Sequence, residues 1–140
     1  MATVTAGITL TSAAGDLITD ALSLSDTTTI TITDMVTSGL ARAKLTSTAK
    51  GTASGQATLY TENEFDAAAN SVYLYIKNTA TTRGHTITVY DGTTSGNPEV
   101  LKLFGGDIAL LPLTDALTFK AYTSNSGTIV ESMVFGTDHA

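Results

Sequence analysis

The stretch VYLYI, residues 72–76, decides the fold class, because large side chains of two kinds alternate along it. In an extended strand successive side chains point to opposite faces. Val72, Leu74 and Ile76 therefore share one face, and Tyr73 and Tyr75 share the other. A helix would instead repeat its apolar positions every three or four residues. The stretch predicts a β-strand in which both faces carry large side chains.

The same two-residue period recurs along most of the chain. It is clear in TTITIT at residues 28–33 and in TITVY at residues 86–90. Turn-forming residues lie between the candidates, as in DGTTSGNP at residues 91–98 and in the pair Gly105-Gly106. Further strands are expected at Val100–Phe104, Ile108–Leu113, Leu117–Tyr122 and Thr128–Phe135, with weaker candidates at Thr3–Leu10, Ala41–Thr48 and Ala57–Tyr60. Short strands between such turns predict an all-β fold, an antiparallel β-sandwich or barrel.

At most one short helix is expected, near residues 62–69. Thr61 and Glu64 have the spacing of a capping box, in which a side chain at each position bonds the backbone of the other. Good helix formers follow Phe65. The alternative is an irregular loop between two strands.

A chain of 140 residues has the size of one domain. Its two parts differ in composition, because every aromatic residue follows position 59. Large side chains build a core, so we expect a compact β-sandwich at residues 56–140. Residues 1–55 are expected to supply strands or an extended arm of the same unit.

Composition argues against several classes of function. The net charge is −6, and the seven Lys and Arg residues are scattered, so no basic patch is expected for a nucleic acid. The absence of cysteine excludes disulfides and thiolate metal sites. The N-terminal residues lack the pattern of a signal peptide, and no apolar run is long enough to span a membrane. Charged residues make up only 14% of the chain and threonine is abundant, which suits contact with other proteins.

No set of residues predicts catalysis. The two histidines are His85 and His139, and only His85 has a carboxylate nearby in sequence, Asp91. A catalytic triad also needs an activated nucleophile, and no nucleophile elbow is present. Glu131 stands in an otherwise apolar stretch, where it is either a catalytic carboxylate or a residue that faces solvent or pairs with a lysine. The second reading is the commoner, so we expect no enzyme and no small-molecule substrate.

No metal or cofactor is expected either. The two histidines do not have the spacing of a zinc site. The aspartates of the first quarter fit no calcium-binding loop; they are Asp16, Asp20, Asp26 and Asp34. No phosphate-binding loop precedes a helix.

Two stretches break the alternation of apolar and polar faces. IALLPL at residues 108–113 is apolar on both faces, and IVESMVF at residues 129–135 nearly so. Such a strand is either covered on both sides by its own chain or faces another subunit. Pro112 favours an edge position or a bulge, since proline cannot donate to a central ladder. If a contact surface exists, we expect it at Tyr73, Tyr75, Ile108, Leu111 and Leu113, together with the N-terminal segment.

The region from Ser71 to Asp138 resembles small β-sandwich decoration, or cement, proteins that bind the outside of tailed-bacteriophage capsids. The stretches that carry the resemblance are SVYLYIKN (71–78), TITVYDG (86–92), LKLFGGDIALLPL (101–113), FKAY (119–122) and VESMVFGTD (130–138). They cover about half of the chain and are structural motifs. The N-terminal half departs from the pattern.

The resemblance implies a jelly-roll-like sandwich and a homotrimer that binds the major capsid protein. It implies a location on the outer surface of the virion, after synthesis in the host cytoplasm, and a role in stabilising the shell by bridging its subunits. Two other functions fit the residues: a tail or head-completion component, and a carbohydrate- or receptor-binding module. For the binding module, Tyr90 beside Asp91 is the expected contact.

Overall fold

The structure is a computed structural model, and it describes residues 2–12, 22–32, 35–51, 54–65, 72–113 and 117–137. The chain divides into two compact units, residues 1–34 and residues 35–140.

The first unit is a β-hairpin of two long strands, β1 (Ala2–Ser12) and β2 (Leu22–Ile32). They pair antiparallel along their full length, from Ala2 opposite Ile32 to Ser12 opposite Leu22. The period of two continues through both strands, which is why threonine-rich sequence forms extended structure here. Both strands are longer than expected from the sequence.

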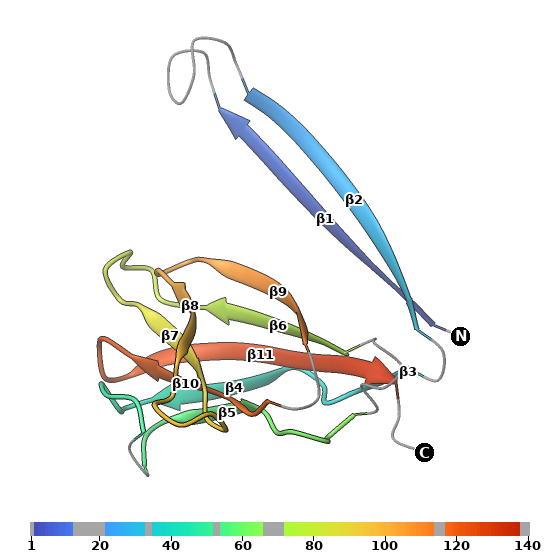
Figure 1. Cartoon of the computed structure of the whole chain (residues 1–140). Coiled ribbons are helices and arrows are strands. Elements are labelled where there is room, and N and C mark those ends of the chain that lie inside the picture. Colours follow the sequence, from blue (N-terminus) through green and yellow to red (C-terminus); the bar gives the residue numbers. More distant parts are fainter. Residues whose placement is uncertain are drawn as a thin grey trace. The chain divides into compact units, whose positions relative to one another are not determined.

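The second unit is a sandwich of two antiparallel sheets (Figure 1). Its strands are β3 (Met35–Thr37), β4 (Ala41–Leu45), β5 (Ala57–Tyr60), β6 (Val72–Asn78), β7 (Ile87–Asp91), β8 (Glu99–Leu103), β9 (Ile108–Leu113), β10 (Phe119–Thr123) and β11 (Thr128–Thr137). In one sheet β3 and β4 pair with β11, which is followed by β6 and β9. The other sheet has the order β5-β10-β7-β8.

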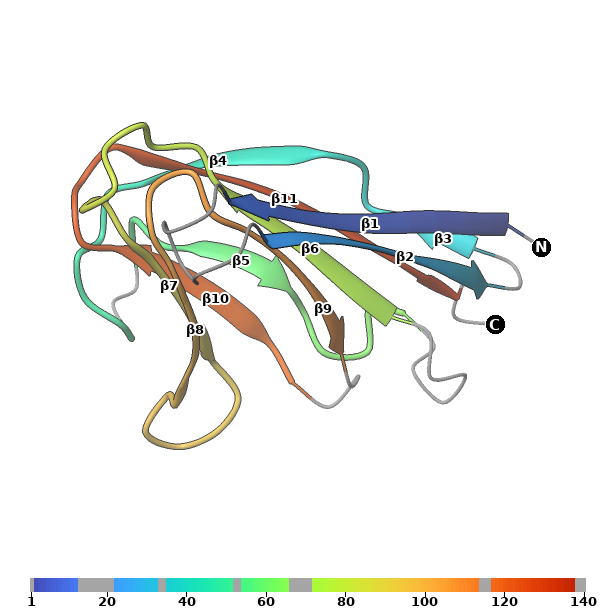
Figure 2. The ribbon, with the colours of Figure 1, turned by 90° about the horizontal axis from the view of Figure 1, so that it is seen from above.

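This order is that of a jelly roll. Counted from β4 as the first, the eight main strands are arranged 1-8-3-6 in one sheet and 2-7-4-5 in the other. Figure 2 shows the result from above, with β4, β11, β6 and β9 following one another across the first sheet. The expected all-β sandwich of jelly-roll type is therefore confirmed.

The core lies between the two sheets and consists of the inward faces of their strands. On β6 the burial alternates along the strand: Val72, Leu74 and Ile76 are buried, and the tyrosines between them are half-buried. Ile87 and Val89 of β7 face them from the opposite sheet. The alternation seen in the sequence thus separates a core face from an outer face.

Two expectations need comment. Glu62–Phe65 forms a turn and a bend in place of the first part of a helix, while residues 66–69 lie outside the described residues. One half of the predicted capping box is present, because the Thr61 N–H donates to Glu64 Oε2 at 3.3 Å.

The sandwich also begins earlier than residue 56, since β3 and β4 pair with β11. Among the described residues no helix has the length and apolar character needed to cross a membrane.

Candidate interaction surface

The surface that stands out is the outer face of the sheet formed by β3, β4, β11, β6 and β9. Residues directly opposite each other in antiparallel strands point to the same face, and Tyr73, Tyr75 and Lys77 point away from the core. The pairing then places twelve residues of β4, β6, β9 and β11 on this outer face: Arg42, Lys44, Tyr73, Tyr75, Lys77, Ile108, Leu110, Pro112, Ile129, Glu131, Met133 and Phe135.

Most of this outer face is apolar. Tyr73 and Phe135 stack with ring centroids 5.5 Å apart and planes 15° from parallel; Tyr73 is half-buried, and Phe135 is only 3% exposed. Ile108 and Ile129 lie in the open, 65% and 40% exposed. Surfaces of this kind mark sites of contact with other proteins when the apolar side chains are contiguous, as they are here across three neighbouring strands.

The apolar area reaches an open edge of the sheet. Among the described residues β9 pairs with β6 alone, so its other side presents unpaired backbone groups. Pro112, opposite Tyr73, lies on this edge strand, which confirms the edge position that the proline predicted. A neighbouring protein could therefore reach both the side chains and the edge of this sheet.

A polar cluster lies in the middle of the outer face. Glu131 is 8% exposed, and its Oε2 accepts hydrogen bonds from the Arg42 guanidinium, with Nη2 at 2.8 Å. Its Oε1 lies 3.5 Å from the Tyr75 hydroxyl. Burial and the nearby Glu131 carboxylate raise the pKa of Tyr75 above its usual value. Glu131 is thus a paired structural carboxylate, bonded to an arginine.

The predicted contact residues separate into two groups. Tyr73, Tyr75 and Ile108 lie on the outer face. Leu111 and Leu113 pack against the core instead, because they have the opposite parity to Ile108 along β9. Their place on the surface is taken by Leu110 and Pro112, which the sequence analysis missed. The signal was the alternation along β9, which puts residues 108, 110 and 112 on one face. That face could be assigned to the outside of the sheet only once the register with β6 was known.

The outer face of the other sheet is different in character. It presents mostly polar groups, among them Thr58, Thr88, Lys102, Lys120 and Tyr122. Tyr90 also points outward but is only 1% exposed, and its hydroxyl donates to the side-chain carbonyl of Gln56. The Tyr90–Asp91 contact expected for a sugar-binding module is therefore not an exposed aromatic ring.

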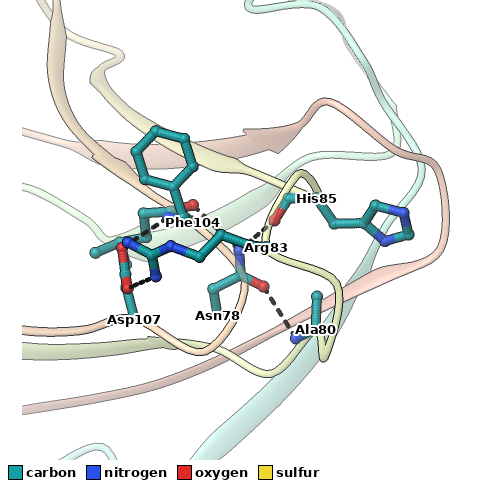
Figure 3. Close-up of polar contacts among 7 residues, drawn as sticks. Asn78, Ala80, Arg83, His85, Phe104 and Asp107 are labelled. Atoms are coloured by element: carbon teal, nitrogen blue, oxygen red, sulfur yellow. Dashed lines mark hydrogen bonds and ion pairs between the residues drawn. The ribbon is translucent and has the colours of Figure 1, made fainter.

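The residues considered for catalysis do not come together. His85 precedes β7 and Asp91 ends it, so the extended strand holds them about 20 Å apart. Figure 3 shows the His85 ring pointing away from Asn78 and from the Arg83–Asp107 ion pair. Asp91 Oδ1 and Oδ2 accept hydrogen bonds from the backbone N–H groups of Thr93 and Thr94. The Thr94 side chain, and after it these N–H groups, hold the pKa of Asp91 below its usual value. The described residues contain no cluster of three potential metal ligands.

An open hollow of about 350 Å³ lies at one end of the sandwich. Its walls come from the loop after β6, residues 79–85, and from residues 126–129, where the turn before β11 runs into that strand. They carry threonines, Ser126 and His85 together with Ala80 and Ile129, and among these described lining residues the His85 imidazole is the one ring.

Comparisons with known proteins assign this chain to no family. No model of a protein family matches it, and no curated protein matches it. Among solved structures, one similar chain comes from a structure described as "Bacillus endospore appendages form a novel family of disulfide-linked pili". The two are 18% identical, with a TM-score of 0.46 over 75% of this chain and 89% of that chain. At that level the likeness supports no functional argument, and the function must be argued from this chain's own residues.

Proposed function

We propose that this chain is a structural, non-catalytic protein that packs against copies of itself and against a larger assembly. The specific form we propose is decoration of a tailed-phage capsid, in which a homotrimer bridges neighbouring subunits on the outer surface of the shell. The observation that carries the proposal is the outer face of β11, β6 and β9, where Met133, Tyr75 and Leu110 form one apolar row and Tyr73 and Pro112 belong to the next, beside the open edge of β9.

The asymmetry of the sandwich supports an assembly role. One outer face is apolar and the other is mostly polar, although both belong to the same small unit. A freely soluble enzyme or binding module gains nothing from an apolar sheet face that is remote from any site. Contact with another subunit would remove that face from water, at about 25 cal/mol for each Å² of apolar surface buried.

The physical basis of shell stabilisation is simple. Packaged DNA pushes the shell outward, and the joints between subunits are where it would fail. A protein that bridges such a joint adds buried area across it, and a standard interface buries about 1,600 Å². A trimer that engages several subunits at once also gains avidity through effective concentration.

The first test is the native mass of the purified chain, measured by light scattering after size exclusion. One chain has a mass of 14.4 kDa, and a trimer is expected at three times that value. Ile108→Lys places a charge on the apolar outer face and should reduce self-association. The matched control is Val100→Lys on β8 of the other sheet, where Val100 is similarly open at 50% exposure. Equal behaviour of the two variants would count against this surface.

The second test concerns the capsid. The chain is added to virions from which it has been stripped, and co-sedimentation is measured together with the resistance of the capsids to heat. Binding that protects the particles is expected for the wild type and for Val100→Lys. A larger ring in solution, with no binding to capsids, would favour a tail or head-completion component instead. A stable monomer that binds a glycan array would favour the carbohydrate-binding module.

A further inference from the structure

The hairpin of β1 and β2 has two faces of opposite character. Along one face the register brings together Ala2, Val4, Ala6, Ile8 and Leu10 of β1 with Leu24, Asp26, Thr28, Ile30 and Ile32 of β2. The other face carries only threonine, serine and Gly7 from residues 3–11 and 23–31. We call these the apolar face and the threonine face of the hairpin. Ile8, Leu10 and Leu24, towards one end of the apolar face, are 62%, 50% and 48% exposed, whereas Ile32 at the other end is buried.

A hairpin of this kind needs a partner. Among the described residues β1 and β2 pair only with each other. An isolated two-stranded hairpin is marginally stable at best in water, and a third strand or a packed apolar face is needed to hold it. Its apolar face runs from Ala2 to Leu10 on β1, a length of about 26 Å.

The charge of the hairpin unit narrows the choice of partner. Residues 1–34 contain Asp16, Asp20, Asp26 and Asp34 and no Lys, Arg or Glu, so this unit carries −4 of the chain's net −6. Asp26 lies on the apolar face, directly opposite Ile8. The preferred partner surface is therefore apolar and locally positive.

The outer face of the sandwich sheet has both properties. Its accessible apolar residues include Tyr73, Leu110 and Ile108, and it carries Arg42, Lys44 and Lys77 against a single carboxylate, that of Glu131. Glu131 is already bonded to Arg42. No ion pair between described residues involves Lys44 or Lys77. In a chain of negative net charge, this face is complementary to the hairpin.

The length of the connection favours docking on another copy. Only residues 33 and 34 separate β2 from β3. β3 belongs to the sandwich sheet that carries this outer face. A hairpin stacked on its own sheet would have to cross a layer spacing of about 10 Å. The three Cα–Cα steps from Ile32 to Met35 span about 11 Å at most, so that link would be almost fully stretched and perpendicular to both strands. A second copy imposes no such constraint.

We infer that the β1–β2 hairpin is a docking arm, whose apolar face packs on the outer face of the β4-β11-β6-β9 sheet of a second copy of this chain. The inference rests on the proposed self-assembly and specifies how it occurs. Each copy offers one arm and one receiving face, so the contact is head-to-tail and closes into a ring when the rotation between copies allows it.

The test compares adjacent residues on opposite faces of the arm. Leu10→Lys charges the apolar face, and Thr11→Lys places the same charge on the threonine face. We expect Leu10→Lys to reduce the native mass to that of one chain, and Thr11→Lys to leave it unchanged. All five tyrosines lie at or after residue 60, so the near-ultraviolet circular dichroism of tyrosine reports whether the sandwich remains folded in both variants.

Cross-linking separates docking on a second copy from docking within one chain. The chain has no cysteine, so Leu24→Cys and Ile108→Cys each supply a unique thiol. The two single variants, one of them isotope-labelled, are mixed and oxidised, and the disulfide between the labelled and unlabelled chains is identified by mass. Thr11→Cys in place of Leu24→Cys is the control. Cross-linked heterodimers are expected only with Leu24→Cys.

The other outcomes have distinct meanings. If Ile108→Lys dissociates the assembly while Leu10→Lys does not, self-assembly stands and the docking arm is wrong. If a Leu24→Cys/Ile108→Cys double variant cross-links within one chain and the mixed single variants do not, the arm docks in cis and a second copy is excluded. If the wild type is monomeric at every concentration, the arm and the proposed self-association both fall.

Discussion

The side-chain amide of Asn78 donates a hydrogen bond to the main-chain carbonyl of Leu103, 3.1 Å away, and so joins the end of β6 to the end of β8 in the opposite sheet. The same Nδ2 donates to the carbonyl of His85 at 2.7 Å. Oδ1 accepts from the N–H of Ala80 at 3.1 Å (Figure 3). Asn78 is fully buried, so water cannot replace these bonds. One side chain therefore fastens two sheets and a loop at one end of the jelly roll.

Replacing this amide should destabilise the fold. In Asn78→Ala two carbonyls and one N–H lose their partner, and each buried polar group left unsatisfied costs about 1–3 kcal/mol. We expect the free energy of unfolding to fall by roughly 3 kcal/mol, measured by urea denaturation. Asn78→Asp should be worse at neutral pH, because its carboxylate cannot donate to either carbonyl. It should recover in part in acid, where the protonated carboxyl donates once. A wild-type stability for Asn78→Ala would contradict this account.

The Gly105-Gly106 turn gives a matched pair of glycines with different requirements. A Cβ on Gly105 would lie 2.2 Å from the carbonyl oxygen of Thr82, so the loop before β7 would have to move. A Cβ on Gly106 would meet nothing within 4 Å, but its φ is +88°. We expect Gly106→Ala to cost about 1–2 kcal/mol through backbone strain. Gly105→Ala should cost more, roughly 3 kcal/mol, through the clash. Thermal unfolding of the two variants checks the order, and a reversed order would refute the packing argument.

How far the sequence predicts this fold is best seen on β6 and β9. On β6 the alternation of apolar and tyrosine residues assigns both faces correctly, because the two kinds of side chain differ. On β9 nearly every residue is apolar, so composition cannot distinguish the faces. Only the register with β6 shows that Leu111 points to the core and Leu110 away from it. That register depends on pairing between distant segments, which local patterns do not contain.

The N-terminal strands show a second limit. The sequence predicts a weak strand at residues 3–10 and a clearer but shorter one at residues 28–33. Threonine nevertheless favours extended backbone, and the strands extend to eleven residues each. β4 lies within the weaker strand candidate at residues 41–48. β3 was missed, because a strand as short as Met35–Thr37 gains its structure from pairing with β11 and has little pattern of its own.

Acid should weaken the sandwich through Asp91. Hydrogen bonds from the Thr94 side chain and from the backbone N–H groups of Thr93 and Thr94 lower the pKa of its carboxylate in the folded state. An unfolded chain has the ordinary value of about 3.9 and binds the proton first as the pH falls. The stability from this group is therefore present above about pH 4 and is lost as the pH falls through the folded-state pKa.

The measurement for Asp91 is the free energy of unfolding between about pH 6 and pH 2, for the wild type and for Asp91→Asn. The asparagine retains one acceptor oxygen but has no proton to gain. We expect the variant to be less stable at pH 6 and its stability to depend less on acid. Asp107, whose pKa is lowered by Arg83 and by the N–H of Phe104, contributes a second decline of the same sign. An equally steep acid decline in Asp91→Asn and wild type would assign the effect to other carboxylates.

Alkali should weaken the sandwich through Tyr75 and Tyr122, which lie on the outer faces of opposite sheets. The pKa of Tyr75 is raised by burial and by Glu131, and that of Tyr122 by its hydrogen bond to Glu99 and by burial. Because the folded-state values lie above the unfolded value of about 10, their stabilising contribution is complete below that pH and is lost as the pH rises through the folded-state values.

Tyr75→Phe keeps the ring and removes the ionisable group, so the loss of stability between about pH 9 and pH 11 should be smaller than in the wild type. The phenolate absorbance should also appear at higher pH for Tyr75 than for a free tyrosine, as the difference spectrum between the variant and the wild type would show. If the two proteins lose stability in parallel above pH 10, the alkaline effect belongs to lysines or to other tyrosines, and the Tyr75–Glu131 contact has no part in it.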